Sequence, residues 1–386
     1  MIYLQALGII SPLGEGLDAT RRGLFAGDTS GMKVESGWLP NAPACVGRVT
    51  AEPAPLPATL AEWDCRNNRL LAAAAAQIRP AIDAALARHG AHRVALVVGT
   101  STSGIAAGED AMAAKISDGA FPRGFSYRQQ EIGGTAPFGA RLLGVRGPAY
   151  TVSTACTSGA KALLAARRLL ELGVCDAAIA GGVDTLCKLT VGGFASLEST
   201  SPQRCNPLSR NRSGINIGEG AALFLLDREE AAVRLAGGGE SSDAHHLSAP
   251  DPQGAGAEGA MRAALSDAGA RAGDIGYVNL HATATRKNDE MESRVMARVF
   301  PAGTPVSGTK PLTGHALGAA GALEAAFCWL ALTDGRLPPH VWDGEADPDL
   351  PALRIAMKGE RLASRMVMSN SFAFGGSNAS LIFCGS

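Results

Sequence analysis

The 386-residue sequence has little net charge, few aromatic residues and no long apolar run. Its formal net charge is −1 at pH 7, so it lacks the excess of basic residues that binds nucleic acid or an acidic membrane surface. No apolar run reaches the length needed to cross a bilayer, and residues 1–5 lack the basic region and cleavage site of a signal peptide. We therefore expect a cytoplasmic protein with neither nucleic acid nor membrane as a partner.

The cysteines also lack a metal-binding arrangement. They are scattered along the chain, and no two of them form a CxxC pair. This spacing indicates neither a zinc site nor a redox dithiol, so we expect no bound metal and reduced thiols, as in the cytoplasm. The eight are Cys45, Cys65, Cys156, Cys175, Cys187, Cys205, Cys328 and Cys384.

Small and apolar residues are abundant: the chain has 48 glycines, and 46% of its residues are hydrophobic against 5% aromatic. Segments typical of buried strands alternate with segments typical of helices, which predicts an α/β fold with mostly parallel sheets. We expect two halves, residues 1–228 and 229–386. Strands are predicted at residues 2–10, 93–98, 149–154, 176–180, 221–227, 277–280, 306–310, 365–369 and 380–384, helices at 17–27, 69–89, 158–172, 257–268, 290–300 and 316–332, and irregular chain at 35–57, 190–220 and 237–256.

Cys156 stands at a junction that favours a reactive thiol. It follows the short β-branched strand 149–154 and precedes the Ala- and Leu-rich helix 158–172. At that position the sulfur faces the free N–H groups and the positive end of the helix dipole, which lower the pKa of a thiol. A buried structural cysteine is the alternative at this point, because most free cysteines are of that kind.

Three later stretches place polar or glycine-rich sequence at strand ends. Residues 279–285 contain His281, residues 308–324 contain Lys310, His315 and Glu324, and residues 370–378 form a glycine-rich turn around Phe374. A single histidine at a strand end is usually structural. Two histidines in such places, together with a cysteine at a helix start, favour a common site.

With these motifs in place, the chain resembles the elongating β-ketoacyl-acyl-carrier-protein synthases of the thiolase superfamily, which are acyltransferases of type II fatty-acid and polyketide synthesis. The resemblance rests on Thr-Ala-Cys-Thr-Ser-Gly at 154–159, on the His281 stretch, on 310–324 and on 370–378, in the family's order. It implies a five-layer αβαβα sandwich of two similar halves that is usually dimeric.

The resemblance also implies roles for individual residues. Cys156 would accept an acyl group, the backbone N–H groups of Cys156 and Phe374 would form the oxyanion hole, and His281 and His315 would stabilise the enolate formed when malonyl carrier protein loses carbon dioxide. The supporting assignments are a Lys310–Glu324 ion pair, Thr283 and Thr285 as ligands of the phosphopantetheine arm, and Phe374 as a gate over the acyl pocket.

The partners that the resemblance implies are an acyl carrier protein and a second subunit. The carrier is acidic, so docking needs local positive charge, for which Arg66, Arg69 and Arg123 are the candidates. The dimer is either a homodimer or a heterodimer with a chain-length-factor-like paralogue. No cofactor is expected beyond the phosphopantetheine that carries the substrates.

The sequence departs from the family in several places. Ala282 replaces a usual glycine near the pantetheine tunnel, where an added methyl would narrow it. Residues 194–198 lack an arginine, and 206–214 lack an aspartate, that fatty-acid members often carry. These differences indicate a specialised pathway, such as polyene synthesis, rather than housekeeping fatty-acid synthesis.

Several alternatives remain at the sequence level. A thiolase would carry a second cysteine in the 370–378 turn, and an initiating ketosynthase would carry asparagine in place of His315; the chain has neither. A subunit that works only beside a chain-length factor, a non-catalytic member of the fold and a simple α/β binding protein stay open.

Overall fold

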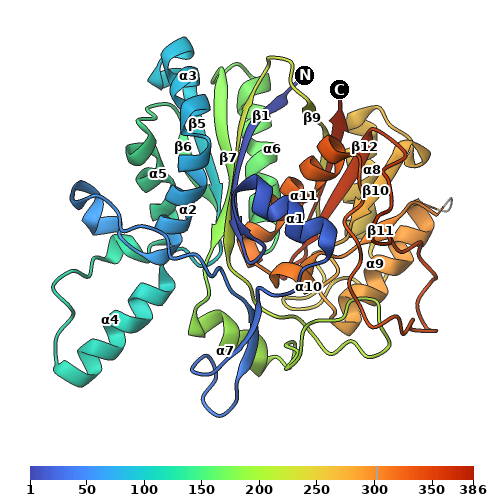
Figure 1. The fold of residues 1–386 in the computed structure, drawn as a ribbon, viewed down its shortest axis with the longest axis horizontal. Helices are drawn as coiled ribbons and strands as arrows, with labels where there is room; N and C mark the ends of the chain where they lie inside the picture. The colour runs from blue at the N-terminus through green and yellow to red at the C-terminus, as the bar shows by residue number, and fades with distance from the viewer. Residues whose placement is uncertain (301–302) are drawn as a thin grey trace.

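The computed structural model describes residues 1–300 and 303–386, which build an 11-stranded sheet flanked by helices (Figure 1). The strands follow the order β11-β10-β12-β13-β9-β1-β8-β7-β5-β6, and the short β2 (Gly14–Glu15) pairs with β1. Besides β2, five strands of this sheet come from the first half: β1 (Tyr3–Ser11), β5 (Val94–Gly99), β6 (Ala149–Val152), β7 (Ala177–Asp184) and β8 (Gly220–Asp227). Five come from the second half: β9 (Val233–Ser242), β10 (Ile275–Asn279), β11 (Val306–Ser307), β12 (Met366–Phe372) and β13 (Ser377–Gly385).

The two halves have the same topology, although their sequences show no repeat. From the outer edge inward, the first half runs β6-β5-β7-β8-β1 and the second half runs β11-β10-β12-β13-β9. In each half, this is the third, second, fourth, fifth and first strand in chain order. In both halves the first two of these neighbouring pairs are parallel and the other two are antiparallel. The expectation of similar halves is confirmed, whereas parallel pairing is limited to the strands that are joined by crossover helices. One antiparallel residue pair, Tyr3 with Arg234, connects the two five-stranded halves of this sheet.

Helices cover the sheets in layers. Helices α6 (Ser158–Glu171) and α11 (Ala320–Asp334) lie between the two halves and share one hydrophobic core with strands of both. The first half is covered on its outer face by α2 (Arg66–Gln77), α3 (Arg79–His89) and α5 (Thr135–Leu143), and the second half by α8 (Ala255–Ala268) and α9 (Arg286–Val299) (Figure 1). These layers confirm the five-layer αβαβα sandwich.

The central helices pack closely because glycines line their contact. A Cβ on Gly159 would lie 2.8 Å from the backbone nitrogen of Ala322, and a Cβ on Gly321 would lie 2.9 Å from that of Ala160. Apart from Glu324, the buried residues of α11 are apolar on all sides, as expected for a helix buried between two sheets. The segment Leu317–Asp334 is also apolar and long enough to pass as a membrane span by length and composition, contrary to the sequence expectation, but 78% of it is buried in this central layer.

Strand β9 is the main element that the sequence analysis missed, because its three consecutive glycines suggested irregular chain. A Cβ on Gly238 would lie 2.1 Å from the Leu164 side chain of α6, and a Cβ on Gly239 would lie 2.0 Å from the Ala260 carbonyl of α8. The glycines thus allow one helix to approach each face of the strand.

The single helix predicted over residues 69–89 is two helices, α2 and α3, which meet at Ile78 with a bend of 75°. Helices that were not predicted are α4 (Ile105–Asp118), α5, α7 (Lys188–Ser196) and the short α10 (Lys310–Thr313). The remaining helix, α1 (Gly16–Ala26), and the two-stranded β3 (Met32–Glu35) and β4 (Ala44–Gly47) complete the fold.

Candidate active site

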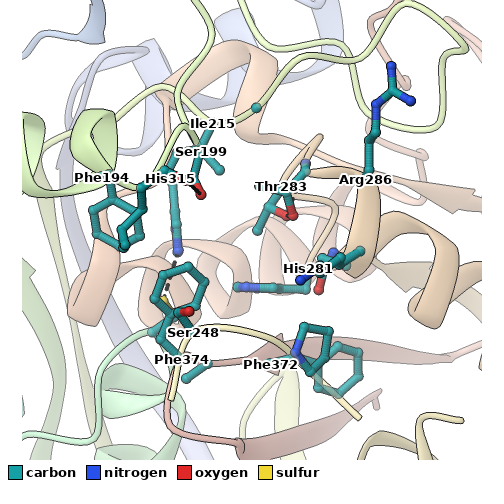
Figure 2. Close-up of a pocket in the computed structure, with 18 of the residues that line it drawn as sticks. Phe194, Ser199, Ile215, Ser248, His281, Thr283, Arg286, His315, Phe372 and Phe374 are labelled. Atoms are coloured by element: carbon teal, nitrogen blue, oxygen red, sulfur yellow. Dashed lines mark hydrogen bonds between the residues drawn. The ribbon is translucent and has the colours of Figure 1, made fainter. Parts of the chain in front are cut away.

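A pocket opens beside the junction of β6 and α6, and Cys156 lies in its lining with His281, His315 and Phe374 (Figure 2). These four residues come from both halves of the chain. The pocket therefore collects the predicted reactive residues from three separate strand–helix connections and from the β12–β13 turn.

The turn before α6 holds Cys156 in a fixed position. Ala155, just before it, has a φ of 52°, a left-handed conformation that costs a non-glycine residue energy. The Ser158 hydroxyl donates to the Ala155 carbonyl at 2.6 Å and accepts from the Thr154 N–H at 2.9 Å, which secures the turn. The Cys156 side chain is 4% exposed, and its Sγ lies 3.0 Å from Nε2 of His315.

The predicted low pKa of Cys156 is wrong for this conformation. Burial raises the pKa of the thiol to about 11, although Lys310 and the backbone N–H groups of Phe374 and Cys156 lower it. Helix α6 begins at Ser158, two residues after Cys156. Burial, followed by the nearby Lys310 ammonium, holds the pKa of His315 well below its ordinary value. The pair is consequently a neutral thiol beside a neutral base.

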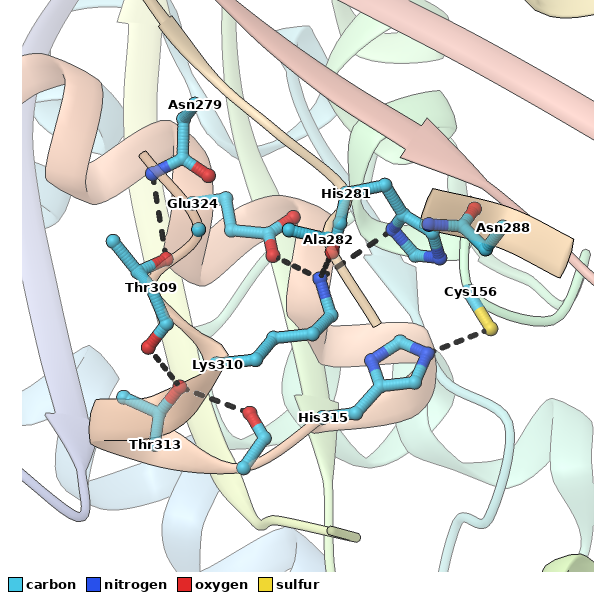
Figure 3. A network of polar contacts seen from close by, with 12 residues as sticks. Cys156, Asn279, His281, Ala282, Asn288, Thr309, Lys310, Thr313, His315 and Glu324 are labelled. Carbon is cyan, nitrogen blue, oxygen red and sulfur yellow. Dashed lines mark hydrogen bonds and ion pairs between the residues drawn. The ribbon is translucent and has the colours of Figure 1, made fainter. Parts of the chain in front are cut away.

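His281 is oriented by the side chain behind it (Figure 3). Lys310 donates to the His281 carbonyl, to Nδ1 of the His281 ring at 3.4 Å and to Oε1 of Glu324 at 2.5 Å. Because an ammonium only donates, Nδ1 carries no proton and Nε2 carries the N–H. Burial lowers the pKa of His281 well below its ordinary value and raises that of Glu324 to about 7. The Lys310–Glu324 contact predicted from the resemblance is present.

His315 has more freedom than His281. Its Nδ1 is buried and has no hydrogen-bond partner among the described residues. Either ring nitrogen can therefore hold the proton, so Nε2 can accept a proton from the thiol or donate to an oxyanion. The His281 and His315 rings meet edge to face with centroids 5.2 Å apart.

Two buried carboxylates that the sequence analysis overlooked hold the chain after His281. Glu292 accepts the backbone N–H groups of His281 and Ala282, both at 2.8 Å, and Asp289 accepts that of Ala284 at 3.1 Å. Ala282 and Ala284 have φ values of 42° and 63° in this turn. The signal was present in the sequence as two acidic residues spaced on one face of a helix start.

Ala282 does not narrow the pocket, contrary to the sequence prediction. It is fully buried in the core of the second half and is absent from the pocket lining. A Cβ on Gly308 would lie 2.5 Å from its methyl group, so the methyl points into the protein and its neighbour is a glycine.

The opposite wall is formed by the glycine-rich turn after β12. Phe374 contacts Phe194 with ring centroids 5.1 Å apart, and both side chains lie at the pocket (Figure 2). The hydroxyls of Thr157 and Ser377 lie 3.1 Å apart and join this turn to the Cys156 turn. The backbone N–H of Phe374 hydrogen-bonds the Cys156 sulfur and lowers its pKa. This N–H is thus placed as an oxyanion-hole donor would be.

The threonines predicted to bind the pantetheine arm also line the pocket. The hydroxyls of Thr283 and Thr285 lie 2.9 Å apart, on the wall beyond His281.

The sulfur of Cys156 and a ring nitrogen of each of His281 and His315 lie within 4.8 Å of one another, a spacing that could hold a metal ion. The adjacent Lys310 ammonium opposes a cation there.

Comparison with known proteins agrees with this geometry. The family model described as "Beta-ketoacyl synthase, N-terminal domain" matches residues 5–232, and "Beta-ketoacyl synthase, C-terminal domain" matches 232–342. The chain belongs to the β-ketoacyl synthase family. Nodulation protein E of Rhizobium leguminosarum bv. trifolii is 40% identical over 258 residues, 63% of each chain, and 3-oxoacyl-[acyl-carrier-protein] synthase 2 of Staphylococcus aureus is 33% identical over 258 residues, 62% of this chain and 64% of the relative. The chain thus spans somewhat less than two thirds of these relatives' length.

Solved structures of similar proteins cover the whole chain. A ketosynthase from Xenorhabdus doucetiae, determined in complex with its chain length factor, is 46% identical with a TM-score of 0.97, covering 100% of this chain and 98% of that one. The ishigamide ketosynthase/chain length factor is 27% identical with a TM-score of 0.91, covering 100% and 99%. A β-ketoacyl synthase from Burkholderia phymatum is 28% identical with a TM-score of 0.87 and the same coverage.

The three arginines proposed for carrier docking do not line the pocket of this β-ketoacyl synthase. Arg66 donates to the buried Glu219 at 2.8 Å and to Glu52 at 3.1 Å, and Arg69 donates to Asp64 at 2.6 Å. Both are engaged in structural ion pairs. Arg123 is exposed, and its docking role stays a prediction.

Asp184, at the end of β7, holds two loops of the active site together, and the sequence analysis missed it. Its fully buried carboxylate accepts the Thr100 hydroxyl at 2.5 Å, the Ser101 N–H at 2.9 Å and the Gly318 N–H at 2.5 Å. Ser101 in turn donates to the Ala155 carbonyl at 3.2 Å. Asp184 therefore connects the turn that carries Cys156 with the loop that follows His315.

Alkylation of Cys156 should test the neutral thiol–imidazole pair. With iodoacetamide, we expect a rate nearly independent of pH between about 7 and about 9, because His315 stays neutral and accepts the proton as sulfur reacts. In His315→Ala the rate should rise about tenfold per pH unit, following the thiolate fraction below the high pKa. Peptide mapping should find Cys156 modified first. A tenfold rise per unit in the wild type would rule out proton transfer to His315.

Substitution Asp184→Asn should lower kcat about tenfold to a hundredfold. The new amide NH2 would face the Thr100 hydroxyl or the Gly318 N–H, which are both donors, and the resulting displacement would shift Cys156 relative to His315. The KM for carrier-bound substrate should change little, and the pH-independent alkylation rate should fall. Asp227→Asn, at a buried carboxylate of β8, is the matched control. Equal losses in both variants, or a loss explained by unfolding alone, would show that Asp184 has only a structural role.

Proposed function

We propose that this chain is an elongating β-ketoacyl-acyl-carrier-protein synthase, which condenses an acyl group held on Cys156 with malonyl carrier protein. The single observation that supports this most is the 3.0 Å contact of the Cys156 sulfur with His315, with His281 in the same buried pocket. Family membership and the similarity to 3-oxoacyl-[acyl-carrier-protein] synthase 2 support the same reaction class.

In the first half-reaction, Cys156 attacks the thioester carbonyl of an acyl carrier protein. The thiol proton passes to Nε2 of His315 as the carbon–sulfur bond forms, which avoids a free thiolate whose pKa is about 11. The N–H groups of Cys156 and Phe374 stabilise the tetrahedral oxyanion. When the intermediate collapses, the carrier thiolate leaves and takes the proton from His315, so the acyl-enzyme forms beside a neutral imidazole.

In the second half-reaction, malonyl carrier protein enters and loses carbon dioxide. The electron pair of the broken carbon–carbon bond becomes an enolate, whose oxygen accepts a hydrogen bond from Nε2–H of His281. It also accepts one from His315 once the proton of that neutral ring has moved from Nδ1, which has no partner in the part of the chain that the structure describes, to Nε2. Lys310 keeps the His281 proton on Nε2, and its own charge lies close to the developing anion. The enolate carbon then attacks acyl-Cys156, and the released thiolate takes one proton from solvent.

The second subunit that we propose is a chain-length-factor-like paralogue. Strand β6 is at the open edge of the sheet, and α4 projects from the body with Met112 50% and Ile116 79% exposed (Figure 1). An open strand edge and exposed apolar side chains each favour an interface. Two similar structures are ketosynthases described together with a chain length factor. We also propose a cytoplasmic location and a specialised pathway, such as polyene synthesis.

Mass spectrometry of the intact protein after incubation with candidate acyl carrier proteins tests the function. We expect one acyl group on Cys156, with chain length set by the pathway, and greater yield after co-expression with the paralogue. Absence of acylation from every carrier, with and without the second subunit, would contradict the proposed function.

A further inference from the structure

Two basic side chains lie at the mouth of the pocket and have no role in the reaction described above. Arg286 and Lys287 are the first two residues of α9, both are exposed, and both belong to the same pocket lining as Cys156. Within residues 1–300 and 303–386, neither makes an ion pair. They differ in this respect from Arg66 and Arg69, whose guanidinium groups are bound to carboxylates.

The charged groups around this mouth leave the two cations available. The hydrogen bond from Arg212 is the main cause that lowers the pKa of Asp347, and the charge of Arg286 contributes last, so this carboxylate belongs to Arg212. The acidic residues in the lining itself are Glu198, which follows α7, and Asp243, which accepts the Asn378 amide at 2.7 Å. On α9 itself, Asp289 is fully buried and Glu290 lies 3.8 Å from Arg212, which leaves Arg286 and Lys287 as the exposed charges without an ion pair, among the described residues, at the start of this helix.

The order of residues along the wall matches the order of groups along a pantetheine arm. Exposure increases along this wall: His281 and Thr283 are buried, Thr285 is half-buried and Arg286 is exposed. Arg286 extends outward beyond Thr283 (Figure 2). From His281 to Arg286 an extended chain spans at most about 18 Å. An arm with its thioester at His281 and its amides at the two threonines would bring its outer end to the start of α9, where the unpaired N–H groups and the helix dipole also favour an anion.

We propose that Arg286 and Lys287 bind the phosphate group of the phosphopantetheine arm. This inference rests on the proposed function and extends it by assigning the part of the substrate that lies outside the pocket. Arg286 offers planar paired donors to phosphate oxygens, and Lys287 adds a mobile positive charge. The pair would then recognise the arm itself, which every carrier protein shares, and leave recognition of a particular carrier to other surfaces.

The test compares two small thioesters that contain no carrier protein: acyl-pantetheine and acyl-4′-phosphopantetheine. The rate of Cys156 acylation is followed by mass spectrometry. In the wild type we expect the phosphorylated thioester to react about tenfold faster at limiting concentration, the value of one charge-assisted hydrogen bond. The double variant Arg286→Ala/Lys287→Ala should lose this preference and keep its rate with acyl-pantetheine. Added salt should weaken the preference in the wild type.

The matched control is Arg271→Ala/Lys358→Ala, which removes the same charge from exposed positions outside the pocket lining. It should keep the preference. The inference is wrong if the wild type does not distinguish the two thioesters, or if the Arg286/Lys287 variant still does. Failure of both thioesters to acylate Cys156 would instead contradict the proposed function, so the two failures are distinguishable.

Discussion

Replacement of Cys156 by Gln is expected to abolish condensation and to leave the decarboxylation of malonyl carrier protein at or above the wild-type rate. Condensation needs the sulfur as nucleophile, whereas enolate formation needs the N–H donors of His281 and His315. The glutamine amide can also occupy the space beside the Phe374 and Cys156 backbone N–H groups and imitate the acylated state.

The measurement is release of labelled carbon dioxide from malonyl carrier protein, run beside product analysis. Cys384→Ser, at a half-buried cysteine of β13 outside the pocket lining, is the control and should keep both activities. Condensation by the Cys156→Gln protein would exclude Cys156 as the nucleophile. Loss of decarboxylation together with condensation, in a folded protein, would mean that the sulfur takes part in both steps.

The two histidines should separate the half-reactions. His281→Ala should reduce decarboxylation about a hundredfold to a thousandfold, as for the loss of an oxyanion-hole donor, and leave acylation of Cys156 measurable. His315→Ala should impair both steps, because the thiol with a pKa of about 11 then lacks the base that lies 3.0 Å from it.

Both half-reactions can be followed on the same variants, acylation by mass spectrometry and decarboxylation by carbon dioxide release. Phe372→Leu is a useful control, because its ring lies 6.0 Å from that of His281 but offers no hydrogen bond. If His281→Ala and His315→Ala lose the two steps in equal proportion, the division of labour inferred from the tautomers is wrong.

The sequence was sufficient for the features that depend on local order. Cys156 at a strand–helix junction and His281 at a strand end are recognisable from hydrophobic pattern and motif, and the fold places both in one pocket. The family resemblance supplied the rest of the expected site, including the Lys310–Glu324 contact.

Features that depend on distant contacts were not predictable in this way. Asp184 binds groups 82 to 134 residues away in the chain, so nothing near it in the sequence marks its role. The pKa of Cys156 was misjudged because the dipole of α6 can be inferred locally, whereas burial by the second half cannot. Strand β9 was missed because its glycines are needed for close contacts with helices α6 and α8, and these contacts cannot be inferred from the local sequence of the strand.

The topology has a consequence for how the protein is made. Each half closes when its first strand pairs with its last, β1 with β8 and β9 with β13. Gln5 at the start of β1 donates to Asp227 at the end of β8, 222 residues later. During synthesis, β1 is made long before its pairing strand β8, and such distant pairing slows folding. The largely buried residues of β1 therefore stay unpaired until most of the first half has been made.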